Sequence, residues 1–196
     1  MTQAQDRYFD VASVHGRFQP LHNGHMEYIE AALERSDFLY IGITQHVLHR
    51  LTQVDSADAL HRVLPQSNPL TYFERATIIE AVLTDAAVPR ERFAILPFPI
   101  EDPLELHEFL PQTIPVLTTT YDAWNVAKIE KLQSQGYEVI NLWTRSTKEV
   151  VGHQIRQLIR AGDPAWREQV PGASVPLLEE YGIAERLQTL LPDDES

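Results

Sequence analysis

The sequence predicts an α/β fold built on a doubly wound, mostly parallel sheet of five strands, with a small C-terminal helical extension. Apolar runs of strand length alternate with segments of helical spacing, which is the pattern of strands joined by helical crossovers. Beyond Gly162 the pattern is helical only, and prolines 164, 171 and 176 interrupt it. We therefore expect one α/β domain over residues 1–162 and a helical extension over residues 163–196 packed on the same domain.

Strands are expected at the five apolar runs, over residues 8–15, 38–44, 93–98, 113–120 and 137–143. Helical spacing predicts helices over residues 23–35, 72–87, 122–135 and 152–161. Thr71 and Glu74 form the sequence pattern of a capping box before the second helix. Gly136 and Gly162 are suited to end the last two helices, because glycine readily adopts the left-handed conformation. This order of elements indicates a Rossmann-like arrangement.

Composition limits the classes of function. The chain has 196 residues and a mass of 22.4 kDa, which fits one domain with a small extension. A net charge of −12 disfavours a protein that coats nucleic acid or a membrane, since such surfaces need a net basic face. The lack of cysteine excludes disulfides, thiolate metal sites and a cysteine nucleophile. Without a secretory signal or a membrane-spanning run, we expect a cytoplasmic protein that acts on small molecules.

The turn after the first strand carries the clearest chemistry. It reads GRFQPLHNGH, and ligands of such sheets bind beyond the carboxyl ends of the strands. His22 and His25 lie three residues apart at a helix start, and Gly24 leaves room for a ligand against the backbone. The helix N-terminus offers unpaired N–H groups to an anion, and Arg17 adds a cation. The turn is suited to a polyphosphate; the alternative is that the two histidines only cap and pack the helix.

The stretch GRFQPLHNGHMEYIEAAL resembles the G-R-x-Q-P-x-H-x-G-H signature of the HxGH nucleotidyltransferase superfamily, and within it the archaeal-type nicotinamide mononucleotide (NMN) adenylyltransferases. NPLTYFERATII resembles that family's N-P-F-T-x-x-E-R segment, and VGHQIRQLI stands in the place of its S-G-T-x-[IV]-R motif. The resemblance implies transfer of a nucleoside monophosphate, chiefly AMP from ATP, to a phosphorylated acceptor such as NMN. Pyrophosphate would leave, Mg²⁺ would bridge the phosphates, and the product would serve NAD biosynthesis.

By this resemblance, His22 and His25 contact the phosphates, and His25 acts on the α-phosphate in the transition state. Arg17 and Arg156 would neutralise the β- and γ-phosphates, although a solvated surface position is the alternative for Arg156. The resemblance also implies a larger set of nucleotide-binding residues: Gly16, Phe18, Gln19, Asn23, Gly24, Gly152, His153 and Ile155. The metal would need few protein ligands, because phosphate oxygens would chiefly hold it, and no protein side chain is assigned to it.

The chain departs from the family pattern at two places. Val151 and His153 replace a serine and a threonine, so two hydroxyl groups are lost and one imidazole is gained. The tryptophan expected to face nicotinamide is also missing, because residues 101–107 read EDPLELH. The acceptor could therefore differ from NMN.

Three residues are candidates for acceptor binding: Trp124, Arg75 and Arg50. Trp124 has a core position as its alternative, and Arg75 could instead pair with a glutamate of its own helix. The polar segment 45–67 has three possible interpretations. It is a basic lid that closes over an anionic acceptor, or an ordinary solvated loop. A histidine metal site is the third interpretation and agrees less well with the spacing.

Two other functions stay open. A cytidylyltransferase for a small phosphate or phosphonate would carry the same signature. A nucleotide-binding module without turnover is the second alternative, motivated by Val151 and His153. In each case we expect small-molecule ligands and a homo-oligomer.

Overall fold

The computed structural model describes residues 7–50, 64–121, 123–147 and 150–190. The chain forms two compact units. Unit 1 comprises Met1–Gly16, Gly24–Thr44 and Pro89–Glu149, and unit 2 comprises Arg17–Asn23, Gln45–Val88 and Val150–Ser196. The predicted domain boundary between residues 162 and 163 stays a prediction. Within the described residues, each helix is too short or too polar to cross a lipid bilayer.

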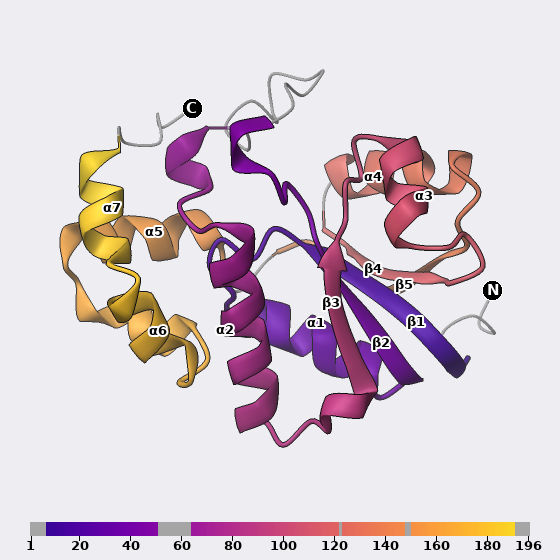
Figure 1. Cartoon of the computed structure of the whole chain (residues 1–196), viewed down its shortest axis with the longest axis horizontal. Coiled ribbons are helices and arrows are strands. Elements are labelled where there is room, and N and C mark those ends of the chain that lie inside the picture. Colours follow the sequence, from indigo (N-terminus) through magenta and orange to yellow (C-terminus); the bar gives the residue numbers. More distant parts are fainter. Residues whose placement is uncertain (1–6, 51–63, 122, 148–149, 191–196) are drawn as a thin grey trace. The chain divides into compact units, whose positions relative to one another are not determined.

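Unit 1 contains a five-stranded sheet in the order β3-β2-β1-β4-β5 (Figure 1). The strands are β1 (Phe9–Gly16), β2 (Ser36–Ile43), β3 (Phe93–Pro97), β4 (Val116–Thr120) and β5 (Val139–Thr144). Every neighbouring pair is parallel. The predicted fold class and the five strands are thereby confirmed.

Helices cover both faces of this sheet. Helix α1 (Asn23–Leu33) leads from β1 to β2, and α4 (Ala123–Ser134) leads in the opposite direction, from β4 to β5. Because parallel crossovers are right-handed, these two helices lie on opposite faces; Figure 1 shows α1 on one side of the strands and α3 and α4 on the other. The core on the second face joins β4, α3 and α4 through apolar side chains: Phe98, Ile100, Leu106, Leu110, Val116, Leu132 and Tyr137.

Helix α3 (Pro103–Phe109) was not predicted. Asp102 caps its N-terminus, because the Asp102 carboxylate accepts hydrogen bonds from the backbone N–H groups of Leu104 and Glu105. Proline is well tolerated at the first position of a helix, because that position has no intrahelical N–H bond to lose. Leu106 is fully buried in the core described above. The segment EDPLELH is therefore a capped helix start.

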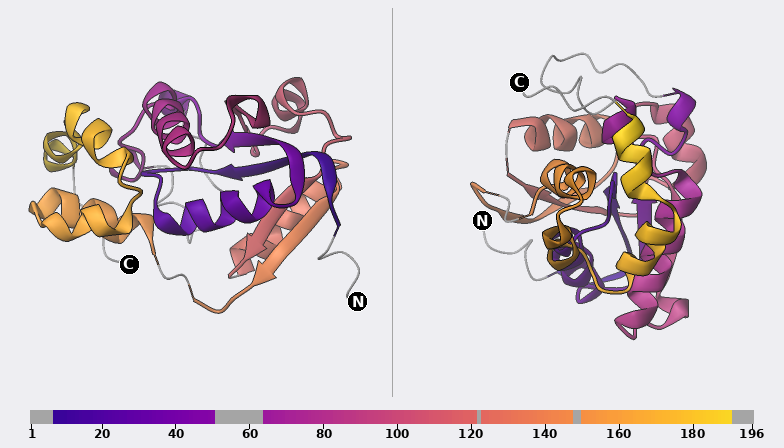
Figure 2. Two further views of the ribbon diagram at one scale, coloured as in Figure 1. Left: turned by 90° about the horizontal axis from the view of Figure 1, so that it is seen from below. Right: turned by 90° about the vertical axis from the view of Figure 1, so that its left-hand side faces the viewer.

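Unit 2 is helical. Its longer helices are α2 (Tyr72–Asp85) and α5 (Gly152–Ala161), followed by α6 (Ser174–Glu180) and α7 (Ile183–Thr189). Figure 2 shows α5, α6 and α7 grouped together, and α5 packs on α7 and on the 3₁₀ segment Pro164–Gln169. The predicted end of α5 is confirmed, because Gly162 has a φ of 73° and its N–H bonds back to the helix. The segment Pro65–Ser67 is a short 3₁₀ turn before α2.

The predicted capping box at the start of α2 is also confirmed. The Thr71 hydroxyl accepts a hydrogen bond from the backbone N–H of Glu74 (3.2 Å), and the Glu74 carboxylate accepts one from the backbone N–H of Thr71 (2.7 Å). Arg186 of α7 binds both carboxylate oxygens of Glu74 at 2.8 Å. Burial alone would raise the pKa of Glu74, but the bonds from Arg186 and Thr71 outweigh burial and leave that pKa below its usual value.

We expect Glu74→Gln to lower the free energy of unfolding by about 1–3 kcal/mol at neutral pH, because charge-assisted hydrogen bonds are lost. The pKa of Glu74 is lowered in the folded state. The ionised carboxylate therefore contributes fully to the free energy of unfolding above the ordinary glutamate pKa of the unfolded chain. This contribution is lost as the pH falls through the lower pKa of the folded state. Urea unfolding at several pH values measures this. Glu80→Gln, an exposed change on the same helix, is the control. Equal stability of the two variants at neutral pH would contradict the expectation.

Candidate active site

The motif predicted to bind phosphate follows β1 directly. Gly16 ends the strand, pairs with Ile43 of β2 and accepts a backbone hydrogen bond from Thr44. His25 lies in the first turn of α1, directly after Gly24, and that turn contains no acidic side chain. The start of α1 thus combines a helix N-terminus with a half-buried imidazole. Gly16, Gly24 and His25 belong to unit 1.

The residues between them, Arg17–Asn23, belong to unit 2 and form a tightly held loop. The Gln19 side chain pairs with the backbone of Leu70 in both directions, donating to its carbonyl (2.8 Å) and accepting from its N–H (2.9 Å). Phe18 is buried and has a φ of 53°, and the peptide bond between Gln19 and Pro20 is cis. Phe18 and Gln19 were predicted to bind the nucleotide. Their side chains build the loop, and their nucleotide contacts stay a prediction.

Arg156 joins this loop to helix α5. Its side chain is buried, with 4% of the residue exposed, and it donates to the Gln19 carbonyl at 2.9 Å and to the Ser67 hydroxyl at 3.4 Å. The alternative prediction, that Arg156 lies on a solvated surface, is therefore wrong.

Gly152 lies in the first turn of α5 and faces the same loop. A Cβ atom at Gly152 would lie 3.5 Å from the Gln19 carbonyl oxygen, 3.6 Å from Nη1 of Arg156 and 3.9 Å from Cδ2 of His22. The first turn of α5 has no acidic residue. The fold therefore brings His22, Gly152 and Arg156 together, although the chain separates His22 from Arg156 by more than a hundred residues. This arrangement gathers a cation, an imidazole and a helix N-terminus, which is the chemistry of an anion site.

Arg75 supports the same loop from α2. With 1% of the residue exposed, it donates to the carbonyls of Arg17 (2.9 Å), Gln45 (2.9 Å) and Thr71 (3.2 Å). Burial lowers the pKa of its guanidinium to about 10. These bonds fix the backbone at Arg17, whose own side chain is half-buried. The role predicted for Arg75 in acceptor binding stays a prediction.

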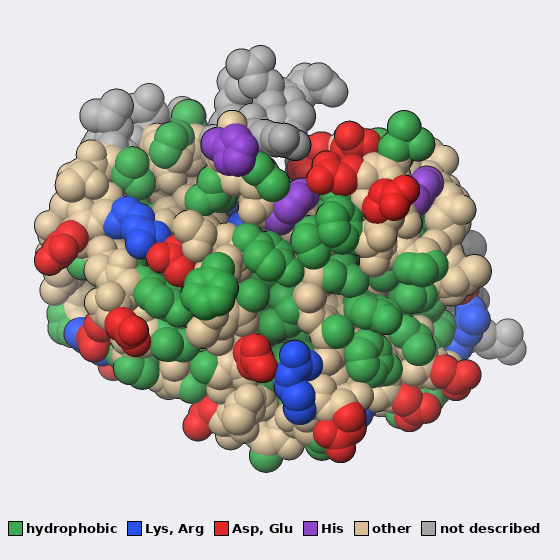
Figure 3. Space-filling model, viewed as in Figure 1, with side chains coloured by type: hydrophobic (Ala, Val, Ile, Leu, Met, Phe, Trp, Pro, Cys, Tyr) green, Lys and Arg blue, Asp and Glu red, His purple; other side chains and the backbone are tan. Residues whose placement is uncertain are grey.

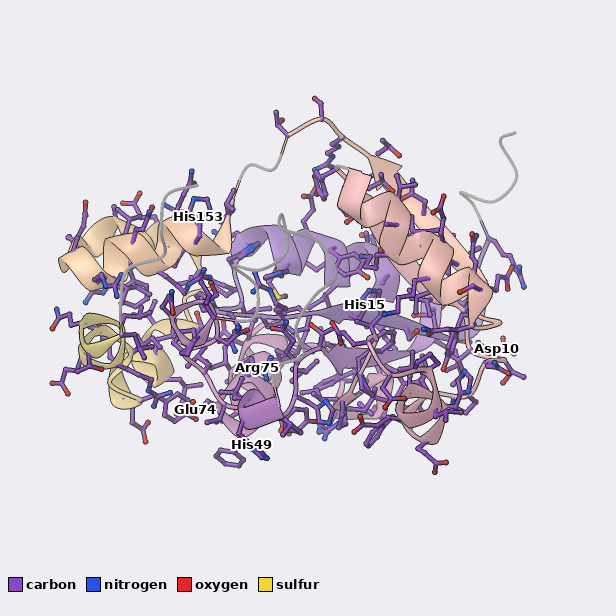
Figure 4. The ribbon with its side chains drawn as sticks, turned by 90° about the horizontal axis from the view of Figure 1, so that it is seen from above. Asp10, His15, His49, Glu74, Arg75 and His153 are labelled. Carbon is purple, nitrogen blue, oxygen red and sulfur yellow. The ribbon has the colours of Figure 1, made fainter. Side chains whose placement is uncertain are left out.

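The other predicted site residues lie in different settings. Asn23 donates to the Glu168 carbonyl at 2.9 Å, which ties the loop to the 3₁₀ segment after α5. Ile155 is fully buried in the apolar face of α5, whereas His153 is exposed in the first turn of that helix (Figure 4). The side chains of Arg50 and Trp124 lie outside the described residues.

His15, at the carboxyl end of β1, was not predicted as a site residue. It is buried and stacks on Phe98, which follows β3. The sequence contained a signal for it, since this histidine ends a mostly apolar strand immediately before the motif.

The described residues contain no group of three or more His, Asp or Glu side chains that could hold a metal ion. On the face shown in Figure 3, described Lys and Arg side chains are scattered among acidic and apolar ones.

The chain resembles known proteins in sequence. Residues 14–96 match the family model described as "Cytidylyltransferase-like". The chain is 39% identical to a phosphonoformate cytidylyltransferase of Streptomyces viridochromogenes, covering 89% of this chain and 94% of the relative. It is 31% identical to a nicotinamide-nucleotide adenylyltransferase of Ignicoccus hospitalis, covering 91% and 96%.

The fold has a counterpart among solved structures. A bifunctional NMN adenylyltransferase/ADP ribose pyrophosphatase from Francisella tularensis matches with a TM-score of 0.67 at 18% identity. The match covers 92% of this chain and 52% of that one, so this chain spans about half of the bifunctional protein. Together with the motif that spans β1 and α1, the matches in sequence show that the chain belongs to the cytidylyltransferase-like, HxGH nucleotidyltransferases and is an enzyme of that class.

Proposed function

We propose that this enzyme transfers a cytidylyl group from CTP to a small phosphonate or phosphate acceptor and releases pyrophosphate. The observation that carries the proposal is the 39% identity to the phosphonoformate cytidylyltransferase, which extends over 94% of that protein. The replacement of the expected nicotinamide-facing tryptophan by the helix start EDPLELH supports it, because this segment offers no indole to a nicotinamide ring.

The proposed reaction is an in-line substitution at the α-phosphorus. An anionic oxygen of the acceptor forms a bond to that phosphorus while the bond to the bridging oxygen of the β-phosphate breaks, and pyrophosphate leaves with the electron pair. The nucleophile is already ionised, so no general base is needed. Catalysis then consists of positioning and of stabilising the charge that develops on the phosphoryl oxygens.

The proposal assigns these tasks to the motif residues. His25 would donate to the α-phosphate, and His22, Arg17 and Arg156 would neutralise the phosphates that leave. Support comes from the buried guanidinium of Arg156 beside the N-terminal turn of α5. Magnesium would enter with the triphosphate as part of the substrate. The homo-oligomer and the cytoplasmic location stay predictions.

The second candidate is the function that the sequence analysis placed first, transfer of AMP from ATP to NMN. It is favoured by several relatives named nicotinamide-nucleotide adenylyltransferase, including those of Ignicoccus hospitalis and Thermoplasma acidophilum at 31% and 30% identity.

One assay separates these functions. Pyrophosphate release is measured with CTP and ATP, each combined with phosphonoformate, with other small phosphonates and phosphates, and with NMN. We expect release with CTP and a small phosphonate or phosphate, and much slower release with ATP and NMN. Release only with ATP and NMN would overturn the proposal in favour of the second candidate. Triphosphate binding without release from any pair would indicate a module that has lost turnover.

A further inference from the structure

His15 is a buried imidazole that the assigned roles do not use. It is the last residue of β1 before Gly16 (Figure 4). Only 6% of the residue is exposed. Neither ring nitrogen has a hydrogen-bond partner in the described part of the chain. A buried polar group left without a hydrogen-bond partner destabilises the folded protein, so a histidine at this position needs a reason.

The ring is held in place by its neighbours in unit 1. It stacks on Phe98 with ring centroids 4.4 Å apart and an angle of 6° between the planes. Gly42 pairs with His15 across β1 and β2, and a Cβ atom at Gly42 would lie 2.4 Å from Cδ2 of Phe98. Glycine at position 42 therefore makes the space in which the Phe98 ring lies. The backbone N–H of His15 is also bound, by the Tyr28 hydroxyl at 3.3 Å. The strand, the glycine and the phenyl ring together fix the orientation of the imidazole.

A cation lies on the same side of the sheet. Lys128 of α4 donates through Nζ to the hydroxyl of Thr118 on β4 at 2.9 Å, and Thr118 is buried. Burial, and then the charge of Lys128, hold the pKa of His15 well below its usual value. At neutral pH the imidazole is therefore neutral and presents one N–H donor beside a lysine charge. A neutral imidazole donor beside a lysine charge is suited to an anion.

We propose that His15 binds an anionic oxygen of the acceptor and thereby helps to determine which acceptor is used. The inference rests on the proposed function, since it takes the acceptor to be a small anion. The acceptor is favoured over the nucleotide base because the Phe98 face next to His15 is already covered by the imidazole, which leaves that face closed to a stacked base. The acceptor is favoured over the triphosphate because the proposed function already assigns donors to the triphosphate, namely His22, His25, Arg17 and Arg156.

The test is His15→Phe, which keeps an aromatic ring for stacking and removes both nitrogens. We expect the KM for the acceptor to rise at least tenfold, as is usual for the loss of a hydrogen bond to a charged group, while the KM for CTP changes less than about threefold. Thermal stability should stay the same or increase, because a buried polar group without a partner has been removed. A second variant, His15→Asn, restores a donor and an acceptor without the stack and should recover part of the acceptor affinity.

An unchanged acceptor KM in a folded His15→Phe protein would show that His15 only packs against Phe98 and would overturn the inference. An increase in the KM for CTP alone would place His15 at the nucleotide and overturn it as well. The wild type is first assayed with the full set of triphosphates and acceptors. If it uses ATP and NMN, the proposed function fails at that stage, and the KM of His15→Phe for NMN then tests His15 separately.

Discussion

Replacing His25 with alanine is expected to lower kcat by about 10²–10³-fold, while the affinity for the triphosphate changes only a few-fold. His25 lies in the first turn of α1, where the helix N-terminus already favours an anion in the ground state. Its imidazole is proposed to act where negative charge develops, on the α-phosphate during substitution. A donor of this kind lowers the energy of the transition state more than that of the bound substrate.

Single-turnover kinetics and binding of a non-hydrolysable triphosphate analogue measure the two effects separately. Glu30→Ala, an exposed change on the same helix, is the matched control and should leave both values unchanged. Turnover of His25→Ala within a few-fold of the wild type would show that His25 caps and packs α1, and the proposed mechanism would be wrong.

The second large effect is expected on stability. Arg75→Met should lower the free energy of unfolding by about 3–5 kcal/mol, because the carbonyls of Arg17, Gln45 and Thr71 lose their buried donor. Activity should fall with it, since the loop that contains His22 loses a support. The measurements are urea unfolding and kcat/KM at a temperature where the variant is folded.

Arg145→Met provides the control for a lost arginine. Arg145 forms an exposed ion pair with Glu27, and such pairs contribute about 0–1 kcal/mol. If Arg75 instead served the acceptor, Arg75→Met would keep wild-type stability and raise only the KM for the acceptor. That result would restore the sequence prediction and contradict the structural role.

Local patterns explain why most of the fold was predictable. Apolar runs mark the five strands, and Thr71 with Glu74 marks the start of α2, because these signals act between residues close in sequence. Helix α3 was not predicted, because a helix of 7 residues is too short to show a clear apolar periodicity in the sequence.

The motif in the sequence supplies the residues of the candidate site, and the roles of His22 and His25 in it stay predictions. The contacts around them were not predictable, because nothing local reveals that Gln19 pairs with Leu70 or that Arg75 reaches Arg17. Such partners depend on how distant segments pack. His15 escaped for a different reason, since a single histidine at the end of an apolar strand looks like an ordinary strand end until its unpartnered nitrogens are seen.

The bond from Arg156 to the Gln19 carbonyl has a consequence for synthesis, because it spans 137 residues. Ribosomes add roughly 5–20 residues per second, so the motif leaves the ribosome on the order of ten seconds before its arginine partner is made. During that interval a nascent chain carries the complete motif without one of the side chains that hold its loop. A polypeptide released before α5 would therefore contain every histidine of the signature and still lack the loop support that Arg156 provides.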